Sequence, residues 1–194
     1  MEQITALTPQ SPKPSRIRVL LENVAYIGAA VILALLVQQF LIRPFIVNGA
    51  SMDPTLKTGD YLLIDRLSYR LHDPRRGDVI IFKAPPEPDK YFVKRIIGLP
   101  GETVHIEGSK VTITNSEYPK GMVLKESFIV HLSKDAPVNI TVPENQYFVM
   151  GDNRAGSYDS RSWGALPKGN ISGRALLRLL PLKTLDYLPG KITY

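Results

Sequence analysis

The sequence predicts a mainly β domain with a small inserted β subdomain, preceded by one transmembrane helix. Two observations support this fold class. Residues 24–42 form a nineteen-residue run without a charge, and beyond residue 44 short runs of Val, Ile, Tyr and Phe alternate with Gly, Pro and Asp. The first pattern is typical of a membrane span, and the second is typical of short strands joined by turns.

The N-terminal segment 1–22 is expected to be a disordered cytoplasmic tail. Residues 1–15 place Pro9, Pro12 and Pro14 among Ser, Thr and Gln. This composition offers too little apolar surface to stabilise a folded structure. We therefore expect no catalytic residue in the tail.

Residues 23–43 are predicted to form the transmembrane helix. At about 1.5 Å per residue, the apolar run spans roughly 28 Å, close to the hydrocarbon thickness of a bilayer. Apolar side chains cover every face of this helix, which argues against a buried core helix. A cleavable secretory signal is the other alternative, because basic residues precede the run and Gly49 and Ala50 follow it. Its apolar region would be too long, and cleavage after Ala50 would make Ser51 the new N-terminus.

Charge and composition narrow the function classes. Lys13, Arg16 and Arg18 precede the span and Arg43 and Lys57 follow it, so the positive-inside rule gives a small preference for a cytoplasmic N-terminus. The formal net charge of +6 comes from Lys and Arg scattered among acids, which disfavours nucleic acid as a partner. The absence of cysteine excludes disulfides, thiolate metal sites and a Cys nucleophile.

Segments 44–102 and 142–194 are predicted to form the main β domain, and segment 103–141 the inserted subdomain. The insert contains alternating strands and polar turns but none of the candidate catalytic residues described below. Proline-rich residues 84–89 are expected to be an exposed hairpin loop. The expected strands are residues 45–47, 61–64, 78–82, 91–97, 103–106, 110–114, 127–132, 139–142, 147–150 and 175–180.

Ser51 is the candidate nucleophile. It follows Gly49 and Ala50, directly after an apolar strand. A nucleophilic serine needs an uncrowded Oγ and nearby backbone N–H groups to receive the oxyanion, and small neighbours permit both. A serine before Met-Asp-Pro can also simply cap a turn, so this tract alone leaves both interpretations open.

Lys94 is the candidate general base. It lies beside Arg95 in the apolar strand expected over residues 91–97, where successive side chains point to opposite faces, so one cation should point inward. Burial lowers the pKa of a lysine and can make it a neutral proton acceptor, which arginine cannot become. Arg95 is then the outward or salt-bridged neighbour. Two solvated charges on an edge strand are the alternative.

Histidine offers no competing base or metal site. His72 lies in a turn, and His105 and His131 lie in strands of the insert. None has small or acidic neighbours that suggest a catalytic imidazole, and their spacing matches no metal-ligand pattern.

A polar tract over residues 151–161 follows the apolar strand 147–150. In an extended segment Ser157, Asp159 and Arg161 project to one side, so Asp159 can pair with Arg161. The hydroxyl of Ser157 can then hydrogen-bond the amine of Lys94 and hold it towards the nucleophile. A polar loop with a surface salt bridge is the alternative.

Together these tracts resemble type I signal peptidases, the membrane-bound Ser/Lys enzymes that release exported proteins. The likeness follows the family's order and covers nearly all of the chain outside the tail and the insert. It implies the coiled β fold that signal peptidases share with LexA-like repressors. It rests on Ser51-Met52-Asp53-Pro54-Thr55-Leu56, Gly59-Asp60, Arg76-Gly77-Asp78-Val79, Lys94-Arg95 with Gly98-Leu99-Pro100-Gly101, Gly151-Asp152-Asn153-Arg154 and Ser157 to Arg161.

The resemblance also implies roles for the site residues. Ser51 matches the nucleophile, Lys94 the general base and Ser157 the lysine-orienting hydroxyl of the family. Asp159 and Arg161 match its supporting ion pair.

Position 49 departs from part of the family. Some members carry there a serine whose hydroxyl assists the oxyanion hole, and Gly49 has no hydroxyl. The donor beside the backbone N–H of Ser51 therefore stays open between backbone and water.

The family's substrates are preprotein signal peptides with small side chains at P1 and P3, as in Ala-x-Ala. The resemblance implies a catalytic domain that rests on the bilayer at the trans side of a plasma or thylakoid membrane, with no metal and no organic cofactor. Shallow apolar pockets for the substrate are expected at Phe45, Val47, Leu56, Phe92 and Val93.

Two rival functions are weighed beside this one. A self-cleaving Ser/Lys repressor-type peptidase shares the core and dyad but carries a soluble DNA-binding domain where this chain has its apolar span. A non-catalytic, membrane-anchored binding module could use the same β scaffold without the chemistry, although the intact dyad motifs argue against it.

Overall fold

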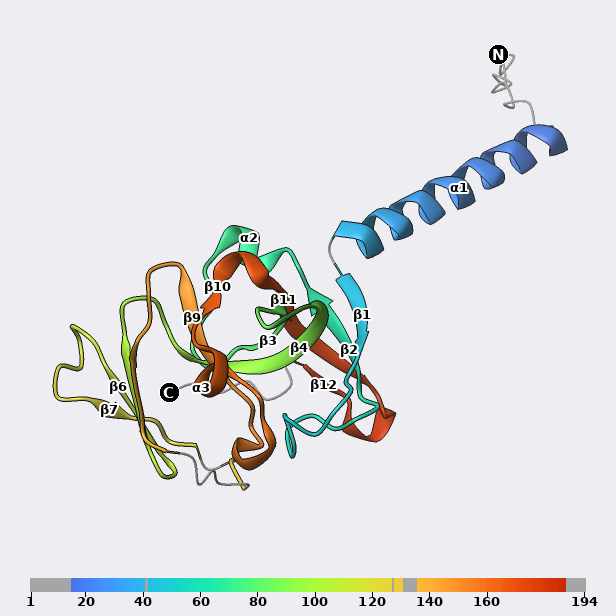
Figure 1. Cartoon of the computed structure of the whole chain (residues 1–194). Helices are drawn as coiled ribbons and strands as arrows, with labels where there is room; N and C mark the ends of the chain where they lie inside the picture. The colour runs from blue at the N-terminus through green and yellow to red at the C-terminus, as the bar shows by residue number, and fades with distance from the viewer. Residues whose placement is uncertain (1–14, 41, 127, 131–135, 188–194) are drawn as a thin grey trace, which may run out of the picture. The chain divides into compact units, whose positions relative to one another are not determined.

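The computed structural model describes residues 15–40, 42–126, 128–130 and 136–187, and it is mainly β, as the sequence predicts. Residues 1–39 and 40–194 form two separate compact units. The elements, shown in Figure 1, are α1 (Arg16–Phe40), β1 (Ile42–Ile46), β2 (Tyr61–Asp65), α2 (Ser68–Leu71), β3 (Val79–Ala84), β4 (Glu87–Gly98), β5 (Thr103–Glu107), β6 (Lys110–Thr114), β7 (Met122–Val123), β8 (Val138–Thr141), β9 (Gln146–Met150), η1 (Arg154–Gly156), α3 (Ser160–Trp163), β10 (Leu166–Pro167), η2 (Lys168–Asn170), β11 (Ile171–Leu180), η3 (Leu182–Thr184) and β12 (Asp186–Tyr187).

Helix α1 is long and apolar enough to cross a membrane. Residues 16–35 have a mean hydropathy of 1.8, and none of them is buried. The helix begins at Arg16, which corrects the expectation of a disordered segment up to residue 22. Arg18 explains the earlier start, because its backbone N–H donates to Ser15 Oγ and its guanidinium pairs with Glu22 one turn later. Residues 1–14 lie outside the described residues.

The helix ends at Phe40, and β1 begins at Ile42. Pro44, the residue directly after the predicted transmembrane segment, lies within β1, where it pairs with Leu63 of β2. Proline is tolerated at this position because β1 is an edge strand.

The larger sheet has eight strands in the order β1-β2-β11-β3-β4-β9-β10, with β12 paired to β11. The pairings of these strands are antiparallel. Strand β2 alternates buried and partly exposed side chains, whereas β3 and the second half of β4 are buried almost continuously. Such continuous burial means that both faces of the sheet are covered at β3 and β4.

The second sheet has four strands in the order β7-β6-β5-β8, all of them within segment 103–141 that the sequence analysis interprets as an insert. It packs through Val104 and Ile113 against Ile97 and Phe148 of the larger sheet, and Val142, just after β8, joins the same cluster. The strand predicted over 127–132 is wrong for residues 128–130, which are irregular, and its other residues lie outside the described ones. Proline-rich residues 85–86 form the turn between β3 and β4, so the expected loop is shorter than 84–89.

The core below β1 and β2 holds the loop that follows β1. Met52 and Leu56 from this loop are fully buried against Leu62, Ile64 and Val93 in one apolar cluster. Each such buried side chain contributes about 1.5–3 kcal/mol of transfer free energy. The burial of Met52 and Leu56 therefore fixes the position of the short segment that carries Ser51.

Candidate active site

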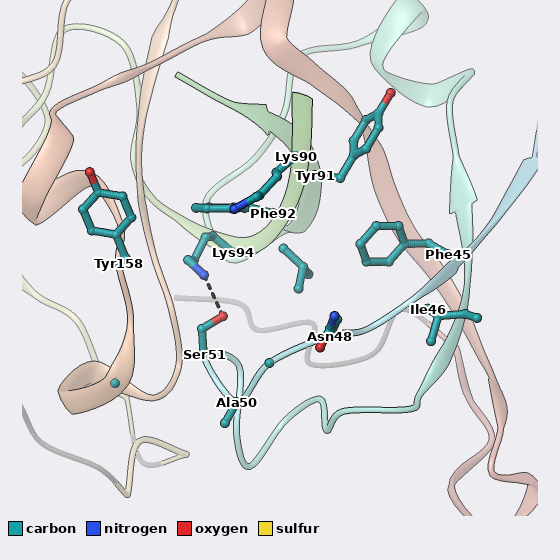
Figure 2. Close-up of a pocket in the computed structure, with 13 residues that line it drawn as sticks. Phe45, Ile46, Asn48, Ala50, Ser51, Lys90, Tyr91, Phe92, Lys94 and Tyr158 are labelled. Carbon is teal, nitrogen blue, oxygen red and sulfur yellow. Dashed lines mark hydrogen bonds between the residues drawn. The ribbon is translucent and has the colours of Figure 1, made fainter. Parts of the chain in front are cut away.

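Ser51 and Lys94 meet although they are far apart in the sequence. Lys94 lies in β4 opposite Ile80 of β3, and its Nζ is 2.6 Å from Ser51 Oγ. Figure 2 shows the lysine side chain extending from β4 to the serine hydroxyl. The distance is that of a hydrogen bond, so the pair is placed for direct proton transfer.

Lys94 is 4% exposed, with its Nζ 5.4 Å from the centroid of the Phe92 ring. Burial lowers the pKa of Lys94 from 10.5 to about 8, while Asp159 raises that pKa and Arg161 lowers it. Desolvation is the largest cause, because an ammonium loses hydration that apolar walls do not replace. A neutral amine is therefore available slightly above neutral pH.

The segment bearing Ser51 is clamped by the loop after β9. Asn153 donates from its backbone N–H to Ser51 O at 3.0 Å and from its side-chain amide to Ala50 O at 3.1 Å. Thr55 Oγ1 donates to Asp152 Oδ2 at 2.5 Å. Both sides of the serine are thus tied to one loop, which limits how far Oγ can move from Lys94.

Arg95 is fully buried on the face of β4 opposite Lys94. Its Nε donates to Asp152 Oδ1 at 2.8 Å and its Nη2 to Asp152 Oδ2 at 2.5 Å, which makes a bidentate pair. Its Nη1 donates to Gly77 O at 2.9 Å. Of the two options for Arg95, outward or salt-bridged, the structure shows the second.

Asp159 and Arg161 form the predicted ion pair. Arg161 Nε and Nη2 donate to the two carboxylate oxygens at 2.8 and 2.9 Å. Their alignment differs from the extended segment expected, because Asp159 caps the short helix α3 and Arg161 lies inside it. Asp159 Oδ2 also accepts from Gly151 N at 3.0 Å, so the pair positions the backbone beside Ser51.

Ser157 lies at the site without the expected contact. Its Oγ is buried and has no hydrogen-bond partner in the described part of the chain, so the expected bond to Lys94 is not formed. It packs closely over Gly151, where an added Cβ would lie 2.2 Å from Ser157 Oγ and 2.3 Å from Ser51 O. The lysine-orienting role of this hydroxyl stays a prediction.

A cavity of about 560 Å³ surrounds the dyad, and three of the predicted substrate-binding residues, Phe45, Phe92 and Val93, line it. The predictions for Val47 and Leu56 are wrong, because these side chains are 2% and 0% exposed within the core. Both side chains pack instead in the apolar cluster that contains Met52 and Leu62.

The sequence and the structure of this chain are similar to those of known proteins. The family model described as signal peptidase, peptidase S26 matches residues 20–180. The chain belongs to this family. It is 37% identical to signal peptidase I of Leptolyngbya laminosa over 96% of either chain, and 36% identical to that of Bacillus licheniformis over 86% of this chain and 91% of the relative. A solved signal peptidase I from Enterococcus faecalis is 32% identical and covers 53% of this chain and 97% of its own, with a TM-score of 0.45.

Gly49 lies two residues before Ser51 and offers no side-chain donor to the site. Its φ of +105° lies in the region that favours glycine, and its N–H donates to Thr58 Oγ1 at 3.1 Å. The backbone N–H of Gly49 is therefore engaged. Within the described residues the backbone N–H of Ser51 makes no hydrogen bond, which leaves it for an oxyanion.

Several site residues were not found by sequence reasoning. Asp152 and Asn153 were quoted only as part of a motif, although their contacts with Arg95 and Ser51 join two distant segments. Tyr158 lines the cavity on the other side of the dyad from Phe45 (Figure 2). The remaining unpredicted lining residues are Ile46, Asn48, Ala50, Lys90, Tyr91 and Gly156.

No group of three or more His, Asp or Glu side chains in the described segments is placed to hold a metal ion. His72 and His105 are exposed, and His131 lies outside the described residues.

Proposed function

We propose that this chain is a membrane-anchored serine endopeptidase that removes N-terminal signal peptides from exported preproteins, with Ser51 as nucleophile and Lys94 as general base. The observation that carries the proposal is the 2.6 Å separation between Ser51 Oγ and the Nζ of a lysine that is 4% exposed. Family membership supports the same reaction, since relatives of this length are named signal peptidase I.

The reaction begins with a neutral Lys94. Its Nζ takes the Ser51 proton while Oγ attacks the carbonyl carbon after the P1 residue, and the oxyanion accepts from the Ser51 backbone N–H. Lys94 then gives that proton to the leaving amine as the C–N bond breaks and an acyl-enzyme forms. A water attacks the acyl-enzyme with Lys94 again as base, which releases the signal peptide and restores Ser51.

The substrate binds as an extended strand between two free sheet edges. Strand β1 is at the end of the sheet, and β4 pairs with β9 only from Arg95 onward, so the described residues 87–94 present an unpaired edge. Residues of both edges line the cavity, which permits hydrogen bonding of a peptide on either side. Phe45 and Val93 line the same cavity as Ser51, and their apolar side chains favour small side chains at P1 and P3.

Helix α1 accounts for the proposed location of the enzyme at a membrane. Helix α1 holds the enzyme in a membrane, and we propose an N-terminus on the cytoplasmic side, with the catalytic unit on the trans side of a plasma or thylakoid membrane. There the cleavage region of an exported preprotein emerges from the bilayer.

The decisive experiment incubates detergent-solubilised protein with a preprotein that carries an Ala-x-Ala site and sequences the new N-terminus. Wild type should cut after the second alanine, and Ser51→Ala and Lys94→Arg should not. Ser116→Ala, at an exposed serine of the second sheet's connecting loop, is the matched control and should cut normally. Retained cleavage by Lys94→Arg would refute the base.

The same assay separates the rivals. Cleavage of the chain itself, in place of the preprotein, would favour the repressor-type peptidase. Binding of the preprotein without any new N-terminus, equal in wild type and Ser51→Ala, would favour a non-catalytic binding module.

A further inference from the structure

The insert contacts the loop after β9 through a buried ion pair. Glu126 lies in the insert between β7 and β8, and its carboxylate accepts hydrogen bonds from Nη1 and Nη2 of Arg154 at 2.8 and 2.5 Å. The side chains of Glu126 and Arg154 are 7% and 6% exposed. A bidentate pair of this kind fixes the plane of the guanidinium as well as its distance from the carboxylate. Glu126 therefore determines where the Arg154 side chain lies.

Arg154 in turn holds the backbone of the loop after β9. Its Nε donates to Gly151 O at 3.1 Å, while its own carbonyl oxygen accepts from Arg161 Nη1 at 2.8 Å. The N–H of Gly151 donates to Asp159 Oδ2 at 3.0 Å. Gly151 is thus held through its carbonyl group by one side chain and through its N–H group by another.

Gly151 lies directly against the segment that carries the nucleophile. A Cβ added to Gly151 would lie 2.3 Å from Ser51 O, and the backbone N–H of Asn153 donates to the same oxygen at 3.0 Å. Because this contact is close-packed, a shift of the loop after β9 also shifts Ser51. Lys94 belongs to β4, so such a shift changes the distance between the two reacting groups.

Neighbours of Glu126 in the insert cover the same buried arginines. The Phe128 ring centroid is 4.6 Å from the guanidinium carbon of Arg95, and Ile129 lies beside Arg154 at a small cavity. Glu126, Phe128 and Ile129 are not among the described residues that line the catalytic cavity. An effect of Glu126 on catalysis therefore has to pass through the loop after β9.

We propose that Glu126 is a positioning residue for peptide cleavage. Through Arg154 it fixes the loop after β9, and thereby the distance between Ser51 and Lys94. The inference rests on the proposed function and deepens it, because it gives the insert a part in the same reaction.

The test measures initial rates of cleavage of an Ala-x-Ala peptide by the full-length protein in detergent, at a temperature at which circular dichroism shows each variant to be folded. Glu126→Gln should lower kcat about tenfold, because a small misplacement of a reacting group is costly. It should change KM less than about twofold, because the edges proposed to bind the peptide belong to β1 and β4. Glu126→Asp keeps the carboxylate on a shorter side chain and should fold, with a kcat between those of wild type and Glu126→Gln.

Glu102→Gln is the matched control. It makes the same change at another buried ion pair, that of Arg76 and Glu102, whose side chains are 11% and 6% exposed. Loss of a buried partner destabilises both proteins, but the control should keep the kcat of wild type.

A double-mutant cycle tests whether Glu126 acts through Arg154. Arg154→Gln removes the contact with Glu126 and the hydrogen bond to Gly151 O together. The double variant Glu126→Gln with Arg154→Gln should therefore lose no more of its kcat than Arg154→Gln alone.

The positioning role is overturned by any of the following results. Wild-type kcat in folded Glu126→Gln and Glu126→Asp would leave the ion pair a structural contact while the proposed peptidase function stands. A raised KM with unchanged kcat would assign Glu126 to substrate binding. An equal loss of kcat in Glu102→Gln would assign the effect to lower stability, and losses that multiply in the double variant would exclude a route through Arg154. Failure of wild type to cut the peptide and the preprotein would reject the function and the role together.

Discussion

Replacing Lys94 with methionine should abolish cleavage and make the folded protein more stable at neutral pH. The lysine is 4% exposed, and burial lowers its pKa from 10.5 to about 8. Between these two pH values the unfolded chain binds a proton at this position that the folded chain does not. Folding stability therefore rises with pH across this interval, and below about pH 8 the folded state bears the full cost of a buried ammonium.

The size of the effect follows from the shift. A lowering from 10.5 to about 8 corresponds to about 3 kcal/mol of lost stability at pH 7. Methionine has a similar length and no charge, so it removes this cost, but it also removes the hydrogen bond to Ser51, which contributes about 1 kcal/mol. The variant should gain about 2 kcal/mol, or roughly 4–8 °C in Tm for a domain of this size.

Thermal unfolding of the solubilised protein between pH 6 and pH 10.5 measures this gain. The difference in Tm between Lys94→Met and wild type should be constant below about pH 8 and should shrink steadily above it. Lys90→Met, at an exposed lysine of the same strand, should show no such difference. A Lys94→Met protein that is less stable than wild type by the same amount at every pH would refute the desolvation argument.

Three further outcomes are expected. In initial-rate assays kcat/KM should rise about tenfold from pH 7 to pH 9, as the neutral fraction of Lys94 increases around a pKa of about 8; a flat profile would contradict this. Gly151→Ala should lower kcat about a hundredfold, because the new Cβ would lie 2.3 Å from Ser51 O, whereas Gly169→Ala has open space and should be neutral. By thermal unfolding, Asp152→Asn should cost about 3–5 kcal/mol by removing the carboxylate that pairs with the buried Arg95; a cost below about 1 kcal/mol would contradict this.

The contact between Ser51 and Lys94 could be predicted from the sequence because the proposed chemistry requires unusual residues in ordinary surroundings. A lysine inside an apolar strand is costly unless it is paired or functional, so Lys94 stood out from the other cations. Ser51 stood out only in combination with it and with the family's motifs. The strands were predictable for the same reason, since β2, β5 and β6 alternate buried and partly exposed side chains as the sequence pattern requires.

The division between cavity wall and core could not be predicted in this way. Val47 and Leu56 are as apolar as Phe45 and Val93, and only the tertiary structure decides that the first two pack inward. The pairing of Arg95 was equally hidden, because its partner Asp152 is 57 residues away along the chain. The early start of α1 depends on a local Ser15–Arg18 contact that hydropathy does not detect.

The two adjacent cations of β4 show how the fold separates structure from catalysis. Arg95 is paired with the carboxylate of Asp152, and this ion pair connects β4 to the loop after β9. The same loop holds Ser51 through the backbone N–H of Asn153. The two charges with the largest effects on the pKa of Lys94, Asp159 and Arg161, are bonded to each other, and their opposing effects partly cancel. Desolvation is then the dominant effect on the amine. The strength of the base is therefore set by apolar burial rather than by a neighbouring charge, which lets the site lose and regain a proton without breaking an ion pair.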